Sequence, residues 1–511
     1  MFHLHSPAER LTSNEDPFPN MKERAMPLNA IVICLDTLRA DCVGPDKALR
    51  EVATPNMDAF ARESVRFVRA FGEGQPTLQM RRAFFTGHRS FPWRYQFDRR
   101  GHWHHAPGWH KIPPHQDTLA EVLLERGYFT GLVADTYHMF KPTMNYTRGF
   151  VTYEFIRGQE TDNWRGGNLN SIAVEVHRYT REPLDPPRIA RLVQYLFNQR
   201  HRASEEDYQC ARVFRSAARW LEDNAGNAPF FLWVDSFDPH EPWDPPRAYA
   251  DRYYAWEGTP GIEYIYPDND AATPEEKARI KALYLGEVTF VDKWVGVLLE
   301  TIDRLKLWDD TIVVLTSDHG TQLMDQGRFG KGASELHPFN TQIPLCVHHP
   351  DGPHDLTVTP FVQSHDLMPT LLRLLEIPYA NVEGQDTWTL VTGERPALRD
   401  HIVTGWASFV TGNAGGRAAV RDDDWAYIVT VHEEDPAPEL YDLHADPGER
   451  HNVYNSHPEV VARQRARLEA VLGQPLPARF PEVCDPAPAP LAMYMRARAR
   501  AQVPSSQREE P

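Results

Sequence analysis

Short, continuous runs of apolar residues recur through the first two thirds of the chain, and segments with a helical repeat separate them. Each run ends in polar or turn-forming residues, and the four clearest are residues 30–35, 131–134, 230–234 and 311–316. Such runs are typical of strands covered on both faces of a parallel sheet. Apolar positions at helical spacing predict helices over residues 57–65, 118–126, 273–305 and 366–375. The alternation predicts a doubly wound α/β domain of mostly parallel strands, with active-site loops at the carboxyl ends of the strands.

The pattern changes after about residue 385. Short segments that alternate apolar and polar residues predict strands over residues 401–406, 417–421, 425–431 and 439–443. One helical pattern follows at 458–472, so we expect a small antiparallel sheet with a helix. The chain is predicted to consist of an N-terminal arm at residues 1–27, a catalytic α/β domain at 28–385, a C-terminal α+β subdomain at 386–480 and a low-complexity tail at 481–511. The tail is a candidate for subunit contact in a homo-oligomer.

Composition narrows the functional classes. The 511 residues include 54 Lys and Arg against 71 Asp and Glu, which leaves a net charge of -17. Such a surface repels nucleic acid and anionic membranes, so neither is expected as a partner. No apolar run reaches the ~18 residues that a membrane span needs, and the N-terminal segment lacks the apolar core of a signal peptide. We therefore expect a cytoplasmic enzyme that acts on a small molecule.

Two strand ends carry residues that suit a metal ion. Asp36 follows the first apolar run directly, and Asp318-His319-Gly320 follows the fourth. Carboxylate and imidazole groups at the carboxyl ends of strands can converge on one cation. The alternatives are that Asp36 caps the next turn and that Asp318 belongs to an ordinary Asp-containing turn.

A hydroxyl and a guanidinium share one face of a predicted helix start. Pro76 precedes Thr77, and Arg81 lies four residues after Thr77, one turn along the same face. The free N–H groups and the positive dipole end of a helix N-terminus suit attack on an anionic centre. The alternative is that Thr77 is a simple N-cap, and one residue can serve both purposes.

Three further residues are weak signals when taken singly. His240 lies in Asp238-Pro239-His240 after the third apolar run, His138 follows the second run, and Lys331 lies in the segment RFGKGAS. Isolated histidines and lysines are more often surface groups or satisfied core groups than catalytic ones.

These motifs occur in a specific order along the chain. A strand ending in Asp36 is followed by T-x-x-x-R-x-x-x-x-T-G, a strand-end histidine, F-x-x-P-H-x-P, a strand with S-D-H-G, and G-K-G. The order resembles the sulfatase family of the alkaline phosphatase superfamily, and the segments ATPNMDAFARESVRF, DLMPTLLRLLEIP and ELYDLHADPGERHNV agree with it. The resemblance covers roughly residues 28–455 and implies the sulfatase fold with a smaller C-terminal α+β domain.

The resemblance implies one divalent metal ion and a covalent mechanism. Asp36, Asp318 and His319 would bind the ion, and the hydroxyl of Thr77 would be both its fourth ligand and the nucleophile. This ligand set suits Mn²⁺, Zn²⁺, Mg²⁺ or Ca²⁺, so the metal stays open. Metal ligation would lower the pKa of the hydroxyl, which allows attack at neutral pH.

The same resemblance implies roles for four basic residues. Arg81 and Lys331 would hold the oxygens of a sulfuryl or phosphoryl group. His240, helped by His138, would protonate the departing oxygen. The implied substrate is a small anionic ester, and the implied activity is its hydrolysis.

Departures from the family pattern bear on the substrate. Most sulfatases have Cys or Ser at the position of Thr77 and oxidise it to formylglycine, which threonine cannot form. Thr37 stands where many sulfatases have a second Asp ligand, and Thr136-Tyr137 stands where they have Lys-Trp, so Thr136 and Tyr137 are predicted substrate contacts. Threonine nucleophiles occur in superfamily members that act on phosphorus. The pattern favours phosphate diesters or phosphonate monoesters over sulfate esters, as in phosphonate monoester hydrolases.

Alternatives stay open for the metal site and the reaction. Asp235, Asp238 and His365 allow a second metal, although the full phosphodiesterase pattern is not found. The His- and Trp-rich segment 98–115 is expected to line the substrate site or an interface rather than to bind metal. The other possible functions are a sulfuric ester hydrolase without formylglycine, a soluble phospho-group transferase using Thr77, and a non-catalytic anion-binding homologue.

Overall fold

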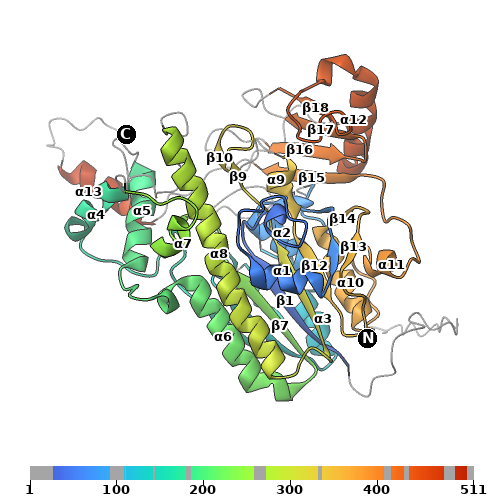
Figure 1. The fold of residues 1–511 in the computed structure, drawn as a ribbon, viewed down its shortest axis with the longest axis horizontal. Helices are drawn as coiled ribbons and strands as arrows, with labels where there is room; N and C mark the ends of the chain where they lie inside the picture. The colour runs from blue at the N-terminus through green and yellow to red at the C-terminus, as the bar shows by residue number, and fades with distance from the viewer. Residues whose placement is uncertain are drawn as a thin grey trace, which may run out of the picture.

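The computed structural model builds the chain around one large mixed sheet (Figure 1). It describes residues 27–92, 109, 111–141, 144–179, 186–257, 272–331, 336–407, 416–430, 437–476 and 490–502. The sheet has eight strands in the order β13-β2-β12-β8-β1-β7-β5-β6. Their bounds are β1 Asn29–Leu35, β2 Val65–Phe67, β5 Phe129–Ala134, β6 Thr152–Phe155, β7 Phe230–Ser236, β8 Thr311–Ser317, β12 Leu345–His348 and β13 Leu356–Val358.

The four predicted buried strands are confirmed. β8, β1, β7 and β5 are adjacent in the sheet and run parallel. All of their residues except Phe129 are buried, because helices cover both faces of the sheet. β12 is antiparallel to both of its neighbours, β8 and β2. The predicted doubly wound, mostly parallel α/β architecture is therefore confirmed.

Helices pack on both faces of this sheet (Figure 1). On one face lie α1 Pro55–Arg62, α6 Gln209–Asn224 and α8 Pro274–Arg304. On the other face lie α2 Thr77–Thr86, α3 Leu119–Glu125 and α10 Leu367–Leu374. Along β1, Ile31 and Ile33 pack against the first set and Ala30 and Val32 against the second. This alternation is the period-two repeat of a strand buried on both sides.

The helix ends follow from local sequence chemistry. α3 begins after Thr118 and α8 begins after Thr273, and each threonine forms a capping box with the glutamate three residues later. The helix predicted over residues 57–65 is wrong at its end, because α1 stops at Arg62 and Val65 begins β2. A β-branched residue that closes a short helical repeat is ambiguous between helix and strand.

A second, five-stranded sheet lies beside the main domain in the order β18-β17-β16-β15-β4 (Figure 1). Its elements are β4 Gly74–Gln75, β15 Ile402–Ala407, β16 Gly416–Arg421, β17 Trp425–Thr430 and β18 Glu439–Asp442, with α12 Pro458–Leu472 packed against them. The strands and the helix predicted for the C-terminal region are present. β4, however, comes from the segment just before Thr77 and pairs in parallel with β15.

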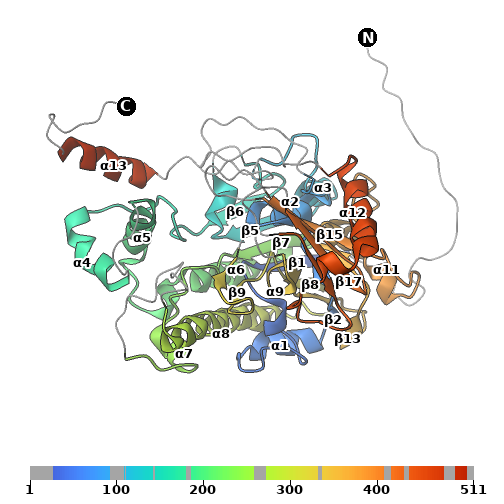
Figure 2. The same cartoon turned by 90° about the horizontal axis from the view of Figure 1, so that it is seen from above.

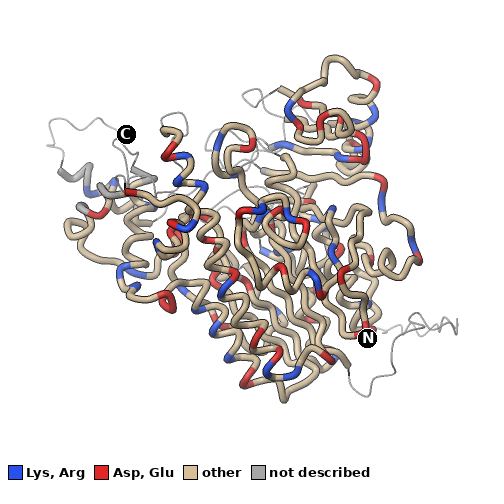
Figure 3. The backbone as a smooth tube through the Cα atoms, in the orientation of Figure 1, with Lys and Arg blue, Asp and Glu red and all other residues tan. Residues whose placement is uncertain are grey.

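A cluster of helices lies on the opposite side of the molecule from the C-terminal sheet (Figures 1 and 2). It consists of α4 Leu169–Tyr179, α5 Pro186–Gln199 and α13 Pro490–Gln502. Leu491 of α13 packs against the apolar cluster that contains Leu192 and Leu196 of α5, so part of the predicted tail contacts the rest of the chain. Acidic and basic positions are interspersed along α6 and α8 (Figure 3). In the part of the chain that the structure describes, no helix has the length and apolar character needed to cross a bilayer.

Short elements complete the connections around the main sheet. They are β3 Ala70–Phe71, β9 Gln322–Leu323, β10 Phe329–Gly330, β11 Gln342–Ile343, β14 Val362–Gln363, α7 Arg247–Asp251, α9 Pro338–Thr341 and α11 Trp388–Val391. β9 and β10 pair antiparallel between His319 and Lys331. This hairpin returns the chain, so that Lys331 lies near the end of β1.

Candidate active site

Two adjacent strands bring three candidate metal ligands to one point. β1 and β8 run parallel with Leu35 opposite Ser317, so the residues that follow both strands leave the sheet at the same edge. One ligand atom from each of Asp36, Asp318 and His319 lies within 4.8 Å of the others, and all three side chains are buried. Among the described residues this is the only such group of three. The structure thus brings together the residues that the two strand-end motifs singled out.

His319 presents an unpartnered ring nitrogen to the two carboxylates. Its Nδ1 lies 2.9 Å from the carbonyl oxygen of Gly320, which accepts the Nδ1 proton. Nε2 lies 3.6 Å from Asp318 Oδ2 and 3.7 Å from Asp36 Oδ1 and has no hydrogen-bond partner. Burial lowers the pKa of His319 to about 4, so the ring is neutral at pH 7. A neutral imidazole with a free lone pair is what a metal ion requires of a histidine ligand.

Negative charge at the same point is only partly balanced. Burial and the charge of Asp318 raise the pKa of Asp36 well above its usual range. Oδ2 of Asp36 is buried and accepts no hydrogen bond, although Arg81 Nη1 lies 3.1 Å away. A divalent cation would relieve both conditions. Asp36, Asp318 and His319 therefore fit a metal ion in charge and in ligand type.

Thr77 is the first residue of α2 and is buried. Its φ of 29° lies in the left-handed region, which β-branched residues rarely adopt. Strained backbone of this kind is concentrated at functional sites. Arg81, one turn later, donates through Nη1 to the carbonyl oxygen of Thr77 at 3.3 Å. The helix start and the guanidinium are therefore joined, as their spacing predicted.

Arg81 is wholly buried, and acceptors surround its guanidinium. Nη1 donates to Asp318 Oδ2 at 2.7 Å, while Nε and Nη2 donate to Asp235 at 3.0 and 2.8 Å. Nη2 also donates to Thr136 Oγ1 at 3.2 Å, and the Thr136 hydroxyl donates to Asp235 at 2.6 Å. The guanidinium thus links α2 to the ends of β5, β7 and β8.

Two of the three residues that left a second metal open are engaged in other hydrogen bonds. The carboxylate of Asp235 accepts hydrogen bonds from Arg81 and from the indole N–H of Trp233. The carboxylate of Asp238 accepts one from the side-chain amide of Gln159 at 2.8 Å. Nε2 of His365 lies 3.8 Å from Oδ1 of Asp366, and its buried Nδ1 has no hydrogen-bond partner in the described part of the chain. Sequence reasoning missed the pairing of Asp235 with Arg81. The available signal was a carboxylate within an otherwise apolar strand.

Lys331 reaches the site from the segment after β10. Its ammonium group donates to the Thr37 hydroxyl at 2.7 Å and to Glu241 Oε2 at 2.6 Å. The Thr37 hydroxyl in turn donates to Asp36 Oδ1 at 2.8 Å, so two hydrogen bonds separate Lys331 from a candidate metal ligand. Nδ1 of His240 lies 2.6 Å from the carbonyl oxygen of Glu241. Glu241, which sequence reasoning did not single out, therefore contacts both predicted residues.

His138 is adjacent to this group through an aromatic ring. Phe237 stacks on His240 with ring centroids 4.0 Å apart and lies 6.1 Å from His138. Trp109 packs edge-on against His138 at 4.8 Å. Apart from Trp109, residues 98–110 of the His- and Trp-rich segment lie outside the described residues. His138 and His240 thus both neighbour the ring of Phe237.

The two predicted substrate contacts, Thr136 and Tyr137, differ in their surroundings. Thr136 belongs to the guanidinium network described above. The Tyr137 hydroxyl donates to Glu160 at 2.7 Å instead. Nζ of Lys141 lies 2.9 Å from Nδ1 of His138, and burial lowers the pKa of Lys141 to about 7. Lys141 thus places a basic side chain close to His138, a few residues after Thr136, the position at which many sulfatases have lysine.

The C-terminal sheet reaches the site through β4 and β15. Trp406 of β15 is opposite Gln75 of β4, and Gln75 precedes Thr77 by two residues. The ring of Trp406 lies 5.6 Å from the ring of His319. A Cβ placed on Gly405 would lie 2.1 Å from a ring atom of Phe91, so this junction has no space for a larger residue. The C-terminal sheet therefore supports the backbone before the predicted nucleophile.

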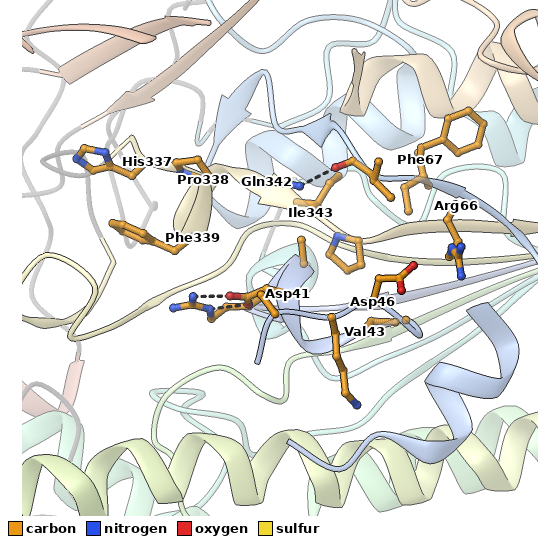
Figure 4. Close-up of a pocket in the computed structure, with 18 of the residues that line it drawn as sticks. Asp41, Val43, Asp46, Arg66, Phe67, His337, Pro338, Phe339, Gln342 and Ile343 are labelled. Carbon is orange, nitrogen blue, oxygen red and sulfur yellow. Dashed lines mark hydrogen bonds and ion pairs between the residues drawn. The ribbon is translucent and has the colours of Figure 1, made fainter. Parts of the chain in front are cut away.

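A separate pocket of about 800 Å³ lies between β2, α9 and the C-terminal region (Figure 4). Asp41, Arg66, Phe339 and Ile343 are among its lining residues, and none of the predicted site residues is. Several charged groups in its wall pair with one another, such as Arg39 with Asp41 at 2.7 Å. The pocket is therefore distinct from the strand-end cluster.

Fold and strand-end geometry together are those of an ester hydrolase of the alkaline phosphatase superfamily. Residues 28–377 match the family described as Sulfatase, and residues 335–474 match the family described as N-sulphoglucosamine sulphohydrolase, C-terminal. The chain belongs to the sulfatase family, which confirms the resemblance inferred from its motifs.

Relatives within this family carry different names. The choline-sulfatase of Rhizobium meliloti is 25% identical over 462 residues, which cover 83% of this chain and 82% of the relative. The N-acetylgalactosamine-6-O-sulfatase of Bacteroides thetaiotaomicron is 24% identical over 522 residues, with coverage of 87% and 93%. The structure of the phosphonate monoester hydrolase of Agrobacterium radiobacter matches with a TM-score of 0.68 and 21% identity, covering 87% of this chain and 95% of that one. This last similarity shows a shared fold.

Proposed function

We propose that the protein hydrolyses small anionic phosphorus esters, phosphate diesters or phosphonate monoesters, through a covalent intermediate on Thr77. One observation carries the proposal: Arg81 joins the start of α2 at Thr77 to the buried Asp36, Asp318 and His319 cluster. A strained hydroxyl-bearing residue at a helix N-terminus is thereby held beside an unbalanced group of metal ligands.

Asp36, Asp318 and His319, with the Thr77 hydroxyl, would hold one divalent metal ion. When bound, that ion would supply positive charge that lowers the pKa of the hydroxyl and stabilises negative charge on the reacting group. His319 is ready for this use, because its Nδ1 proton is held by Gly320 and its Nε2 is free. The assay described below compares Mn²⁺, Zn²⁺, Mg²⁺ and Ca²⁺ as the bound ion.

The reaction needs two displacements at the same central atom. In the first, Oγ of Thr77 has released its proton to solvent and bonds to phosphorus, while the bond to the leaving oxygen breaks. That oxygen takes a proton from His240, so a neutral alcohol departs. In the second, water gives a proton to His240 and bonds to phosphorus, and the bond to Thr77 breaks. Thr77 takes a proton from solvent, which restores the starting state.

Lys331 is the cationic group that supports binding of the substrate oxygens. Its ammonium group is less enclosed than the guanidinium of Arg81, which already donates to Asp235, Asp318 and Thr136. In this proposal Arg81 mainly holds the carboxylates and the start of α2, and contributes charge to the transition state from there.

A threonine nucleophile favours phosphorus over sulfur in this scaffold. The hydrate of a formylglycine can expel sulfate by breaking its own C–O bond, whereas a threonine ester must be cleared by attack on the central atom. Sulfate ester hydrolysis is the second candidate, because the relatives of similar length include sulfatases by name.

A panel of nitrophenyl esters tests the proposal. Protein loaded separately with each of the four metal ions would be assayed with a phosphonate monoester, a phosphate diester, a phosphate monoester and a sulfate ester. We expect the highest kcat/KM for the phosphonate monoester or the diester. A preference for the sulfate ester above about a hundredfold would overturn the phosphorus assignment, and no turnover of any ester would overturn hydrolysis itself.

A further inference from the structure

We propose that Glu241 is a positioning residue that places the His240 imidazole for proton delivery to the leaving oxygen and keeps Lys331 separate from it. This inference rests on the proposed function, because it concerns the leaving-group step of that reaction. It adds a role for a residue that the motif pattern did not single out.

One carboxylate oxygen makes both contacts. Oε2 of Glu241 accepts from Nζ of Lys331 at 2.6 Å and lies 3.3 Å from Nδ1 of His240. Oε1 has no hydrogen-bond partner. The whole side chain is buried, with 4% of its surface exposed. Oε2 therefore stands between two groups that would repel each other when both are charged.

The backbone of the same residue orients the imidazole. Nδ1 of His240 lies 2.6 Å from the carbonyl oxygen of Glu241, so Nδ1 carries the proton that this oxygen accepts. Phe237 stacks on the ring at 4.0 Å and restricts its rotation. Nε2 is thereby left as the nitrogen that gains and loses the catalytic proton.

Electrostatics explain why a carboxylate is needed at this point. Burial and the charge of Lys331 lower the pKa of His240, and the charges of Glu241 and Glu160 oppose this effect. Burial acts to raise the pKa of Glu241, but Lys331 and His240 lower it to about 2. Glu241 is therefore ionised at pH 7. Its charge favours the imidazolium form, which is the form that can protonate a leaving oxygen.

A purely structural role predicts something different. If Glu241 only neutralised the buried Lys331, its loss would weaken substrate binding and stability by the same factor for every ester. If it also supports proton delivery by His240, the loss must grow as the leaving group becomes more basic. A nitrophenolate departs with little help, whereas an unsubstituted phenolate needs the proton.

The test is therefore a leaving-group series with Glu241→Gln. Aryl esters of the preferred acid, from 4-nitrophenyl to unsubstituted phenyl, would be assayed with the metal-loaded wild type, Glu241→Gln and His240→Asn. We expect kcat/KM, which reports the steps up to departure of the leaving group, to fall in Glu241→Gln by about tenfold more for the phenyl ester than for the nitrophenyl ester. His240→Asn should show the same trend, and the double variant should lose less than the product of the two single losses.

Glu449→Gln is the matched control. Glu449 is a buried glutamate whose Oε2 lies 2.6 Å from Nδ1 of His337, outside the candidate active site. The ratio of its rates with the two esters should equal the wild-type ratio within about twofold. Because the comparison is a ratio within one protein, a lower folded fraction does not change it.

Each result decides one question. A loss in Glu241→Gln that is equal for all leaving groups would overturn the inference and leave the proposed function standing. A wild-type protein without activity on any ester would overturn the proposed function instead. If Glu241→Gln does not fold, Glu241→Asp decides: the shorter side chain keeps the charge but lies farther from His240, so a leaving-group-dependent loss supports the inference and a uniform loss overturns it.

Discussion

Two buried clusters of charged residues differ in how completely they are paired. In the C-terminal domain, Glu449 contacts His337 at 2.6 Å and Arg421 at 2.5 Å, and Glu439 contacts Arg417 at 2.7 Å. Each carboxylate there has a cationic partner. Two guanidinium groups match two carboxylates, so their charges are balanced within the protein, as expected of groups that serve the fold.

The charges of the strand-end cluster are not balanced in this way. One guanidinium, that of Arg81, lies among the carboxylates of Asp36, Asp235 and Asp318. Nε2 of His319 has no partner at all. Burying charge without full compensation costs stability, so such an arrangement is retained where something else completes it. This difference supports the proposal that the unbalanced cluster is the active site.

The sharpest test of this distinction is Thr77→Ala. Removing the nucleophilic oxygen should lower kcat by at least about 10³-fold while circular dichroism and the melting temperature stay near wild type. Thr86→Ala, a buried threonine at the other end of the same helix, is the matched control and should keep most activity. Activity of Thr77→Ala within about tenfold of wild type would remove Thr77 from the mechanism.

Asp318→Asn should act on metal content as well as on rate. We expect the bound metal, measured by elemental analysis after dialysis, to fall well below one ion per chain, with a loss in kcat of about 10²- to 10³-fold. Treatment of the wild type with a chelator should lower kcat by a similar factor, and added metal should restore the activity. Asp325→Asn, which removes a carboxylate paired with Arg39, is the control and should bind metal as wild type does. Equal metal content in Asp318→Asn and wild type would show that Asp318 is not a metal ligand and would remove the proposed difference between the two clusters.

Asp235→Asn tests the anchor of Arg81. It removes the charge that Nε and Nη2 contact and leaves the guanidinium buried with fewer acceptors. Loss of one partner of a buried pair costs about 3–5 kcal/mol, so thermal and urea unfolding should both show a large destabilisation. The kcat/KM should fall by about tenfold or more, because α2 is no longer held to β7. Wild-type stability would show that Asp235 is not the main anchor.

Glu449→Gln tests whether the charged cluster of the C-terminal domain serves the fold alone. It should destabilise the protein by about 1–3 kcal/mol, measured by urea unfolding, because His337 and Arg421 lose their shared partner. At a temperature where the variant is folded, kcat should stay within about twofold of wild type. A large drop in kcat would mean that this charge-balanced network also serves the reaction.

His365, another buried histidine, should make the stability of the protein depend on pH. Burial lowers the pKa of His365 to about 3 from an unfolded value near 6.5. Between these values the unfolded chain binds one more proton than the folded chain, so stability rises with pH and is lost as pH falls from about 6.5 towards 3. His365→Asn should reduce this slope by up to about 1.4 kcal/mol per pH unit. Urea unfolding at pH 7 and pH 5 measures it, and an unchanged slope would exclude His365 as its source.

Much of the fold was predictable from local patterns. The strands at the ends of which Asp36 and Asp318 lie are continuous apolar runs, as is typical of strands buried on both faces of a sheet. The capped starts of α3 and α8 follow from Thr118 and Thr273. These features depend on residues within a few positions of one another, so one sequence suffices to find them.

Other features were not predictable in this way. β4 joins the C-terminal sheet although more than 300 residues separate it from β15, and β12 runs antiparallel in an otherwise parallel region. The contacts of Glu241 with Lys331, and of Asp235 with Arg81, likewise join segments that no local pattern connects. Their partners depend on how distant strands and loops pack, which propensity and periodicity do not encode.

The chain's own residue order was enough to determine the α/β architecture, the family and the identity of the charged and hydroxyl groups at the strand ends. Only the tertiary structure decided which of those groups have hydrogen-bond partners and balancing charges and which do not. Hydrophobic periodicity acts along the chain and can be read from it, whereas the balance of a buried charge depends on every group within a few ångströms. For Asp36, His319 and Glu241 those groups include residues from distant parts of the sequence.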